Sequence, residues 1–189
     1  MLNKLKKIKP KHILEMLVIL ISFIPGMILR LIKRDIWIVA ENGDDAKDNG
    51  YAFFKYAMEN KTKKDIYYVI TKKSIYYDKL KKYNKNLLYK NSLKHNIYTI
   101  ASTKYISSQI GSGLPFPELV FNFQGTFIYR FKSIFLQHGI TQNKVQCLLK
   151  NESKVDLFCC AGNKEYDFVI NELGYNEENA KKTGFCRYD

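Results

Sequence analysis

The sequence predicts an α/β fold, a Rossmann-like parallel sheet flanked by helices and preceded by an apolar helix. After Asp35, short apolar runs rich in β-formers alternate with runs of helical period, which is the rhythm of βαβ units. The β-rich runs are apolar throughout, as in strands covered on both faces. We therefore expect residues 36–189 to form one sheet domain and residues 1–35 to form a separate basic, apolar segment.

Each element has its own local signal. Strands are expected in "IWIVA", "DIYYVI", "NLLYK", "TKYISSQ", "SIFLQ" and "VDLFCCAG", and helices in 48–60, 74–83, 92–102 and 163–174. The first of these helices has Asp48 or Asn49 as its N-cap. Residues 111–125 contain Gly, two prolines and aromatic residues, and we expect a long loop there.

Composition restricts the partners. Lys and Arg number 31 against 18 acidic residues, a net charge of +13, which favours an anionic partner such as a membrane surface or a phosphate-rich polymer. The lysines are spread through the chain and no recognition element accompanies them, so we expect no nucleic acid. The four cysteines have no C-x-x-C spacing and the three histidines lie far from them, so no metal site is expected.

The segment from Ile13 to Ile32 is long enough to cross a bilayer, but Glu15, Pro25 and Arg30 interrupt it. Basic residues flank it on both sides, which suits a helix lying in the headgroup region of an anionic leaflet. A soluble helix packed on the domain is the alternative. No small-residue cleavage site follows, so a secretory signal peptide is not expected.

The segment "FLQHGI" (residues 135–140) places His138 directly after a predicted strand, at the sheet edge where ligands of such folds bind. A neutral imidazole there can take a proton from an alcohol. Gly139 would let the backbone turn sharply, and free N–H groups at Thr141 would attract a phosphate. The alternative is that His138 only forms hydrogen bonds within its turn. His95 is expected at the surface or boundary of a helix.

Other strand ends are also candidates for binding residues, whereas two further motifs are not. Glu41 to Asp45 and Gly162 also follow strands and are candidates for a shared cleft. The segment Gly111-Ser112-Gly113 lacks the third glycine of a dinucleotide fingerprint and the lysine of a P-loop, so we expect no nucleotide site there. No serine has the context of a hydrolase nucleophile elbow.

Three stretches, "WIVAENGDDAKDNGYAFFKYAMEN", "SIFLQHGITQNKV" and "DLFCCAGNKEYDFVINELGYNEENAKKTGFCRYD", together resemble the amino-terminal half of the CDP-glycerol glycerophosphotransferases. These are teichoic acid primases and polymerases. The resemblance implies the acceptor-side half of a two-domain GT-B arrangement, with the carboxy-terminal donor domain absent from this sequence. In "TGFCRYD" the family usually has proline at the position of Cys186.

The resemblance also implies a reaction. An acceptor hydroxyl attacks the β-phosphate of CDP-glycerol, and glycerol phosphate is transferred while CMP leaves. His138 matches the family's proposed general base, and Gly139, Glu41, Asp48, Asn49 and Arg187 are carried over as substrate-binding positions. The simpler alternative for Asp48 is that it only caps its helix. For Lys164 and Glu165, in the family-like "KEYDF", the alternative is that they only form an exposed start of a helix.

Partners and location follow from the same resemblance. The acceptor would be a lipid-linked glycerol phosphate or sugar at the cytoplasmic face of the cell membrane, the donor would be CDP-glycerol or its ribitol counterpart, and no cofactor is expected. We expect this chain to be nearly inactive without a donor domain, which a partner chain could supply. The alternative from another class is a non-catalytic module that binds anionic lipid or polymer.

Overall fold

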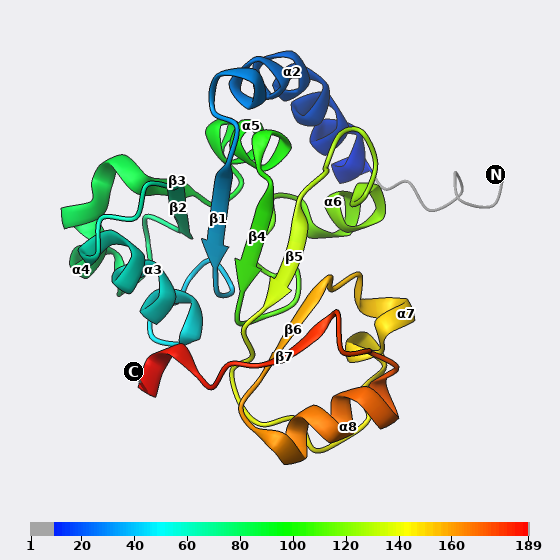
Figure 1. Cartoon of the computed structure of the whole chain (residues 1–189). Helices are drawn as coiled ribbons and strands as arrows, with labels where there is room; N and C mark the ends of the chain where they lie inside the picture. Colours follow the sequence, from blue (N-terminus) through cyan, green and yellow to red (C-terminus); the bar gives the residue numbers. More distant parts are fainter. Residues whose placement is uncertain (1–9, 189) are drawn as a thin grey trace, which may run out of the picture.

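The computed structural model describes residues 10–188, and it forms one parallel sheet with helices on both faces (Figure 1). The strands are β1 Ile36–Ala40, β2 Asp65–Ile70, β3 Leu87–Tyr89, β4 Lys104–Ser107, β5 Lys132–Phe135, β6 Leu157–Cys160 and β7 Ala180–Lys182. The helices are α2 Pro10–Ile32, α3 Asn49–Glu59, α4 Tyr77–Leu80, α5 Leu93–Ala101, α6 Pro117–Phe123, α7 Lys150–Ser153 and α8 Asn163–Leu173. Short 3-10 turns are η1 Lys81–Asn86, η2 Gln146–Leu148 and η3 Cys186–Tyr188.

All neighbouring strands of the sheet are parallel, in the order β3-β2-β1-β4-β5-β6-β7. The order reverses between β1 and β4, where doubly wound folds have their topological switch point. Because the strands are parallel, their carboxyl ends share one edge of the sheet. Figure 1 shows this edge on the side away from α2.

The predicted α/β class is confirmed, and each predicted strand is present. The structure differs from the sequence-based picture at three places. The helix expected over 74–83 is α-helical only in α4, and the chain then continues as the 3-10 turn η1. The expected loop 111–125 contains the helix α6, which begins after Phe116 and has Pro117 in its first turn. The short edge strand β7 had no strong sequence signal, since two of its three residues are exposed lysines.

The core lies on both faces of the sheet, as the continuous apolar runs indicate. Ile36, Ile38 and Ala40 of β1 pack with residues of α5 on one face, whereas Val39 packs with Phe54 of α3 on the other. Helix α3 begins at the predicted N-cap, because the Asp48 carboxylate accepts the Asn49 N–H at 2.8 Å. The local signals and the burial pattern therefore agree.

Helix α2 lies along the domain and is attached to it at both ends. His12, Ile19, Ser22 and Gly26 are buried along one stripe that faces the protein. At the beginning of the helix, His12 Nε2 lies 3.1 Å from Glu118 of α6. At the other end, the Arg30 guanidinium donates to the Ile128 carbonyl at 3.0 Å and to the Ile100 carbonyl. Packing on the domain, one of the two sequence-based alternatives, is thus observed.

The remaining surface of α2 is apolar and exposed. Leu20 is 69% exposed and Leu31 is 78% exposed, and the exposed isoleucines Ile21, Ile24 and Ile28 lie between them. Within residues 10–188, α2 is the one helix long and apolar enough to cross a membrane, although length and composition alone are weak evidence for that. The lysines Lys4, Lys6, Lys7 and Lys9, part of the predicted basic arm, lie outside the described residues.

The expectation that His95 lies at the surface is wrong. His95 is 0% exposed and lies among the buried residues of α5, with Asn96, Thr99, Ile100 and Ala101. The Asn91 N–H donates to His95 Nδ1 at 3.2 Å, so the neutral ring carries its proton on Nε2. Burial, together with the smaller effect of the nearby Lys90 charge, lowers the pKa of His95 to about 3.

A bulkier residue at Gly26 should loosen the attachment of α2. A Cβ atom added at Gly26 would lie 2.6 Å from Ile100 Cγ2, so Gly26→Val forces α2 away from α5. We expect a loss of about 1–3 kcal/mol in the free energy of unfolding, measured in urea. The control Ile24→Val, at an exposed position of the same helix, should change it by less than about 0.5 kcal/mol.

Folding stability should fall in acid because of His95. The unfolded chain takes up a proton on this ring near its ordinary pKa of about 6.5, whereas the folded chain does so only at about 3. The contribution of neutral His95 is therefore complete above about pH 6.5, and it is lost by up to about 1.4 kcal/mol per pH unit as the pH falls towards 3. Urea titrations should show a smaller slope for His95→Gln; an unchanged slope would contradict this assignment.

Candidate active site at the carboxyl edge of the sheet

The site is built on a turn that follows β5. The chain leaves the sheet after Phe135, and Leu136 and Gln137 are still buried. Gln137 has φ of +66°, a left-handed conformation that is uncommon outside glycine. The sharp turn expected at Gly139 therefore occurs at Gln137, and it directs the next side chain, His138, out of the sheet into solvent.

A buried carboxylate holds this turn in place. Glu165 of α8 accepts the Gln137 side-chain amide at 2.7 Å and the Thr141 N–H at 2.5 Å. Its second oxygen accepts the Ala161 N–H at 2.6 Å. Glu165 was expected at an exposed helix entry, but it is buried because it joins the end of β6 to the turn after β5, whereas Lys164 is exposed.

The same contacts correct the expectation of a phosphate site at Thr141. No helix begins there, and the Thr141 N–H already donates to Glu165. The Thr141 hydroxyl lies 3.1 Å from the Gln137 side-chain oxygen, which further closes the turn. The backbone at Thr141 therefore stabilises the loop and has no N–H group left for an anion.

The ring of His138 is exposed, and one of its two nitrogens has a partner. Nδ1 lies 3.1 Å from the backbone carbonyl oxygen of Ser108, just beyond the end of β4. Because a carbonyl oxygen only accepts hydrogen bonds, Nδ1 must carry the proton in this contact. In the neutral ring the lone pair is then on Nε2, which is the state that a general base requires.

Asn49, at the start of α3, connects the His138 turn to the end of the described chain. Its side-chain amide donates to the Gln137 carbonyl at 2.8 Å and to the Leu136 carbonyl at 3.3 Å. Its side-chain oxygen accepts the Arg187 N–H at 3.1 Å. Asn49 is fully buried, so both polar groups of its side chain are occupied within the protein.

Arg187 closes this arrangement with an ion pair. Its guanidinium lies 2.6 Å from the Asp48 carboxylate and donates to the His138 carbonyl at 3.0 Å. Both side chains of the pair are mostly buried. Asp48 thus has two roles, as the N-cap of α3 and as the partner of Arg187.

Glu41 lies beneath this group, directly after β1. It is 1% exposed, and its carboxylate accepts the backbone N–H groups of Lys47, Asp48 and Tyr51 at 2.8–3.3 Å. Burial raises the pKa of Glu41, while these three N–H groups oppose the rise. Contact between Glu41 and a substrate would require the loop before α3 to open.

The crevice at the switch point is filled by the protein itself. The Gly113 N–H donates to the Tyr105 hydroxyl at 3.1 Å, and a side chain at Gly113 would collide with Ala40. The backbone at Gly113 therefore lies directly against the ends of β1 and β4. The open part of the edge lies farther along the sheet, where a cavity of about 700 Å³ is lined by Thr141, Gly162, Lys164 and neighbouring residues.

The predicted residues are distributed as follows. His138, Asp48, Asn49 and Arg187 meet in one connected group, and an added Cβ at Gly139 would contact nothing within 4 Å, so the backbone there is open. Whether Glu41, Asp48, Asn49, Gly139 and Arg187 touch a substrate stays a prediction. Sequence reasoning missed Gln137 and Ser108, and it assigned Glu165 to an exposed helix entry; Gln137 and Glu165 both lie within stretches that resemble the family, whereas Ser108 does not.

Within residues 10–188, no group of three or more His, Cys, Asp or Glu side chains is arranged to hold a metal ion. The cysteines of this part of the chain form no disulfide, and Cys159 and Cys160 are buried in β6. Burial raises the pKa of Cys159 to about 11. The side chains that meet at the carboxyl edge therefore offer proton transfer and hydrogen bonding as their chemistry.

Known proteins resemble this chain in sequence and in fold. Minor teichoic acid biosynthesis protein GgaB of Bacillus subtilis (strain 168) is 34% identical over 161 residues, which are 83% of this chain and 18% of GgaB. The chain thus spans about a fifth of that relative's length.

Two solved structures of the wall teichoic acid polymerase TagF share the fold. One, a variant, has a TM-score of 0.55 at 11% identity and covers 95% of this chain and 49% of TagF. The other has a TM-score of 0.53 at 10% identity and covers 81% of this chain and 38% of TagF. The family described as CDP-Glycerol:Poly(glycerophosphate) glycerophosphotransferase matches residues 24–189. Since that match includes both the sheet and the site, the chain belongs to the CDP-glycerol:poly(glycerophosphate) glycerophosphotransferase family.

Proposed function

We propose that this chain supplies the acceptor side of an enzyme that transfers glycerol phosphate from CDP-glycerol to a hydroxyl of a membrane-linked acceptor. The product would be teichoic acid or a related cell-surface polymer. The observation that supports this proposal best is the orientation of His138, whose exposed ring donates through Nδ1 to Ser108 and presents Nε2 to solvent. Membership of the family agrees with this chemistry.

In the proposed reaction the acceptor oxygen forms a bond to the β-phosphorus of CDP-glycerol. The bond between that phosphorus and the oxygen bridging to the α-phosphate breaks, and CMP leaves with the electron pair. His138 Nε2 takes the hydroxyl proton as the oxygen attacks. The imidazolium that forms keeps its Nδ1–H on the Ser108 carbonyl, which holds the ring and stabilises its charge.

The donor side of the reaction is proposed to come from outside this sequence. The chain corresponds to about half of TagF, and we infer that it forms the amino-terminal half of a GT-B arrangement. A donor domain, in the same protein or in a partner chain, would bind the cytidine nucleotide and complete the cleft. Transfer requires both reactants in one geometry, so this chain alone should have little or no activity.

The membrane attachment is proposed to involve α2 at the cytoplasmic face. Its outward face is apolar and exposed, and a net charge of +13 favours an anionic surface. Since both ends of α2 are attached to the domain, an orientation in the membrane plane fits better than a crossing.

The second candidate function is a module that binds anionic lipid or polymer without turnover. The exposed apolar face of α2 favours it, because that face requires no catalytic group. The two functions differ in one measurement. A non-catalytic module would bind vesicles equally well after His138→Ala and would release no CMP even when a donor domain is supplied.

Replacing the proposed base should abolish most of the activity. With a donor domain and a glycerol-phosphate acceptor supplied, His138→Ala should lower CMP release from CDP-glycerol by about 10²–10⁴-fold, the usual contribution of a general base.

Lys144→Ala is the matched control, since Lys144 is an exposed residue of the same loop region and pairs with Glu172 at 3.7 Å. It should leave CMP release unchanged. Equal CMP release by the wild-type protein and His138→Ala would contradict the assignment of the base.

The Asp48–Arg187 pair should act as a positioning device for the His138 turn. In a double-mutant cycle, Asp48→Ala and Arg187→Ala should show a coupling of about 0.5–3 kcal/mol in the free energy of unfolding, because the pair is mostly buried. Either change should lower kcat more than it alters the KM for CDP-glycerol. The Asp78–Lys81 pair has the same N–O distance of 2.6 Å but is exposed, and its coupling should stay below about 0.5 kcal/mol.

A further inference from the structure

An apolar groove opens between α2 and the segment that follows α6. It has a volume of about 740 Å³, and its walls include Met16, Leu20 and Phe23 of α2, Phe123 at the end of α6, and Phe127 and Ile128 beyond α6. Phe127 is 61% exposed and contacts Phe23 edge-on, with 5.8 Å between the ring centroids. Every residue that lines the groove is apolar, which is typical of a surface that contacts lipid or another apolar partner.

A basic cavity lies on the other side of Phe127. Its volume is about 590 Å³, and it is lined by four cationic side chains, Arg130, Lys132, Lys150 and Lys154, and a single carboxylate, Asp156. That carboxylate is occupied, since it lies 3.1 Å from Lys132 and accepts the Ser133 N–H at 2.8 Å. The cavity therefore has an excess of positive charge. Phe127 lines both the groove and the cavity, so the two are neighbours.

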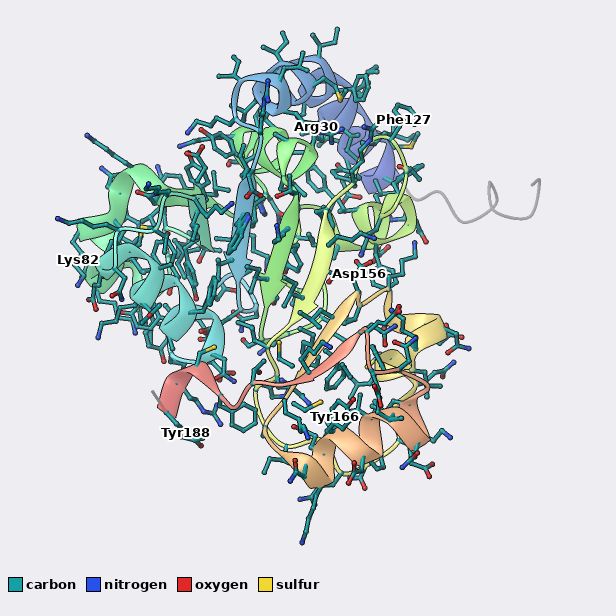
Figure 2. All side chains as sticks on the ribbon, in the orientation of Figure 1. Arg30, Lys82, Phe127, Asp156, Tyr166 and Tyr188 are labelled. Atoms are coloured by element: carbon teal, nitrogen blue, oxygen red, sulfur yellow. The ribbon has the colours of Figure 1, made fainter. Side chains whose placement is uncertain are left out.

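The segment between the two spaces is held in position by α2. Arg30 donates to the Phe127 carbonyl at 3.3 Å and to the Ile128 carbonyl at 3.0 Å, and Figure 2 shows Arg30 and Phe127 close together above Asp156. Burial lowers the pKa of Arg30, and the positive charge of Arg130 lowers it further. An anion beside Arg130 would relieve this repulsion between like charges.

These two spaces lie at the amino ends of β5 and β6, whereas His138 follows the carboxyl end of β5. The strand β5 separates the two, and its extended backbone from Lys132 to Phe135 rises about 10 Å. Because the His138 ring lies beyond the carboxyl end of the strand, against the Ser108 carbonyl, a phosphate in the basic cavity is too far from the imidazole to react. Its role would be attachment.

We propose that the groove and the cavity together bind one anionic glycerophospholipid of the bilayer, with an acyl chain in the groove and the headgroup phosphate in the cavity. This inference deepens the proposed membrane attachment by naming the lipid class and the residues that contact it. It does not depend on the transfer reaction.

The test is flotation of the full chain with vesicles of phosphatidylcholine, with and without phosphatidylglycerol. Arg130→Gln should weaken binding to the phosphatidylglycerol vesicles by at least about fivefold, the factor expected for one cation at an anionic surface. Lys82→Gln removes the same charge on a distant surface of the molecule (Figure 2) and should change binding by less than about twofold. An equal loss of vesicle binding in both variants would show that binding depends only on the overall positive charge of the protein, and would overturn the lipid site.

A second variant separates the lipid site from attachment by α2. Leu31→Asp places a charge on the exposed apolar face of α2, at a residue that does not line the groove, and should abolish binding to both kinds of vesicle. Loss in Leu31→Asp together with wild-type binding in Arg130→Gln would keep α2 as the attachment and overturn the lipid site. Soluble glycerol phosphate should not displace the chain from vesicles; displacement at concentrations similar to those of the lipid would show a free phosphate site instead.

A photoactivatable phosphatidylglycerol gives a direct readout in the wild-type chain. With the reactive group on an acyl chain, labelled peptides should include residues 123–128 as well as α2. Labelling confined to α2 would overturn the proposal.

Discussion

The left-handed backbone at Gln137 is the constraint on which the candidate active site depends. A residue other than glycine adopts this conformation at a cost of order 1 kcal/mol, and only where its surroundings hold it. Here Glu165 binds the turn from the side of β6, and Asn49 binds it from the side of α3. Because these contacts come from both sides of the sheet, the direction of the His138 side chain is a property of the whole carboxyl edge.

Sequence reasoning was sufficient where the signal is local. The apolar runs predict the buried strands, Asp48 precedes its helix as an N-cap, and the strand end before His138 places that residue at the correct edge. It was insufficient where a role depends on partners distant in the chain. Glu165 reads as an exposed helix entry, and its burial follows only from contacts with Gln137 and Thr141. His95 is likewise buried by the tertiary packing around α5, which no local pattern in the sequence predicts.

The two edges of the sheet present different chemistry. The carboxyl edge gathers the imidazole, the buried carboxylates and the open backbone at Gly139, all of which suit a polar reaction. The amino edge carries the apolar groove beside α2 and the basic cavity next to Phe127, which suit an interface between lipid and water. Parallel strands make this division possible, because every strand begins at one edge and ends at the other.

The attachment of α2 at both its ends has a geometric consequence. With His12 fixed to α6 and Arg30 fixed to the carbonyls near Phe127, the helix cannot pivot independently of the sheet. If α2 rests on a bilayer, the imidazole stands at a constant height above the lipid headgroups. The length of the acceptor would then decide which acceptors react. An acceptor whose free end extends to that height would reach the imidazole, and a shorter one would not.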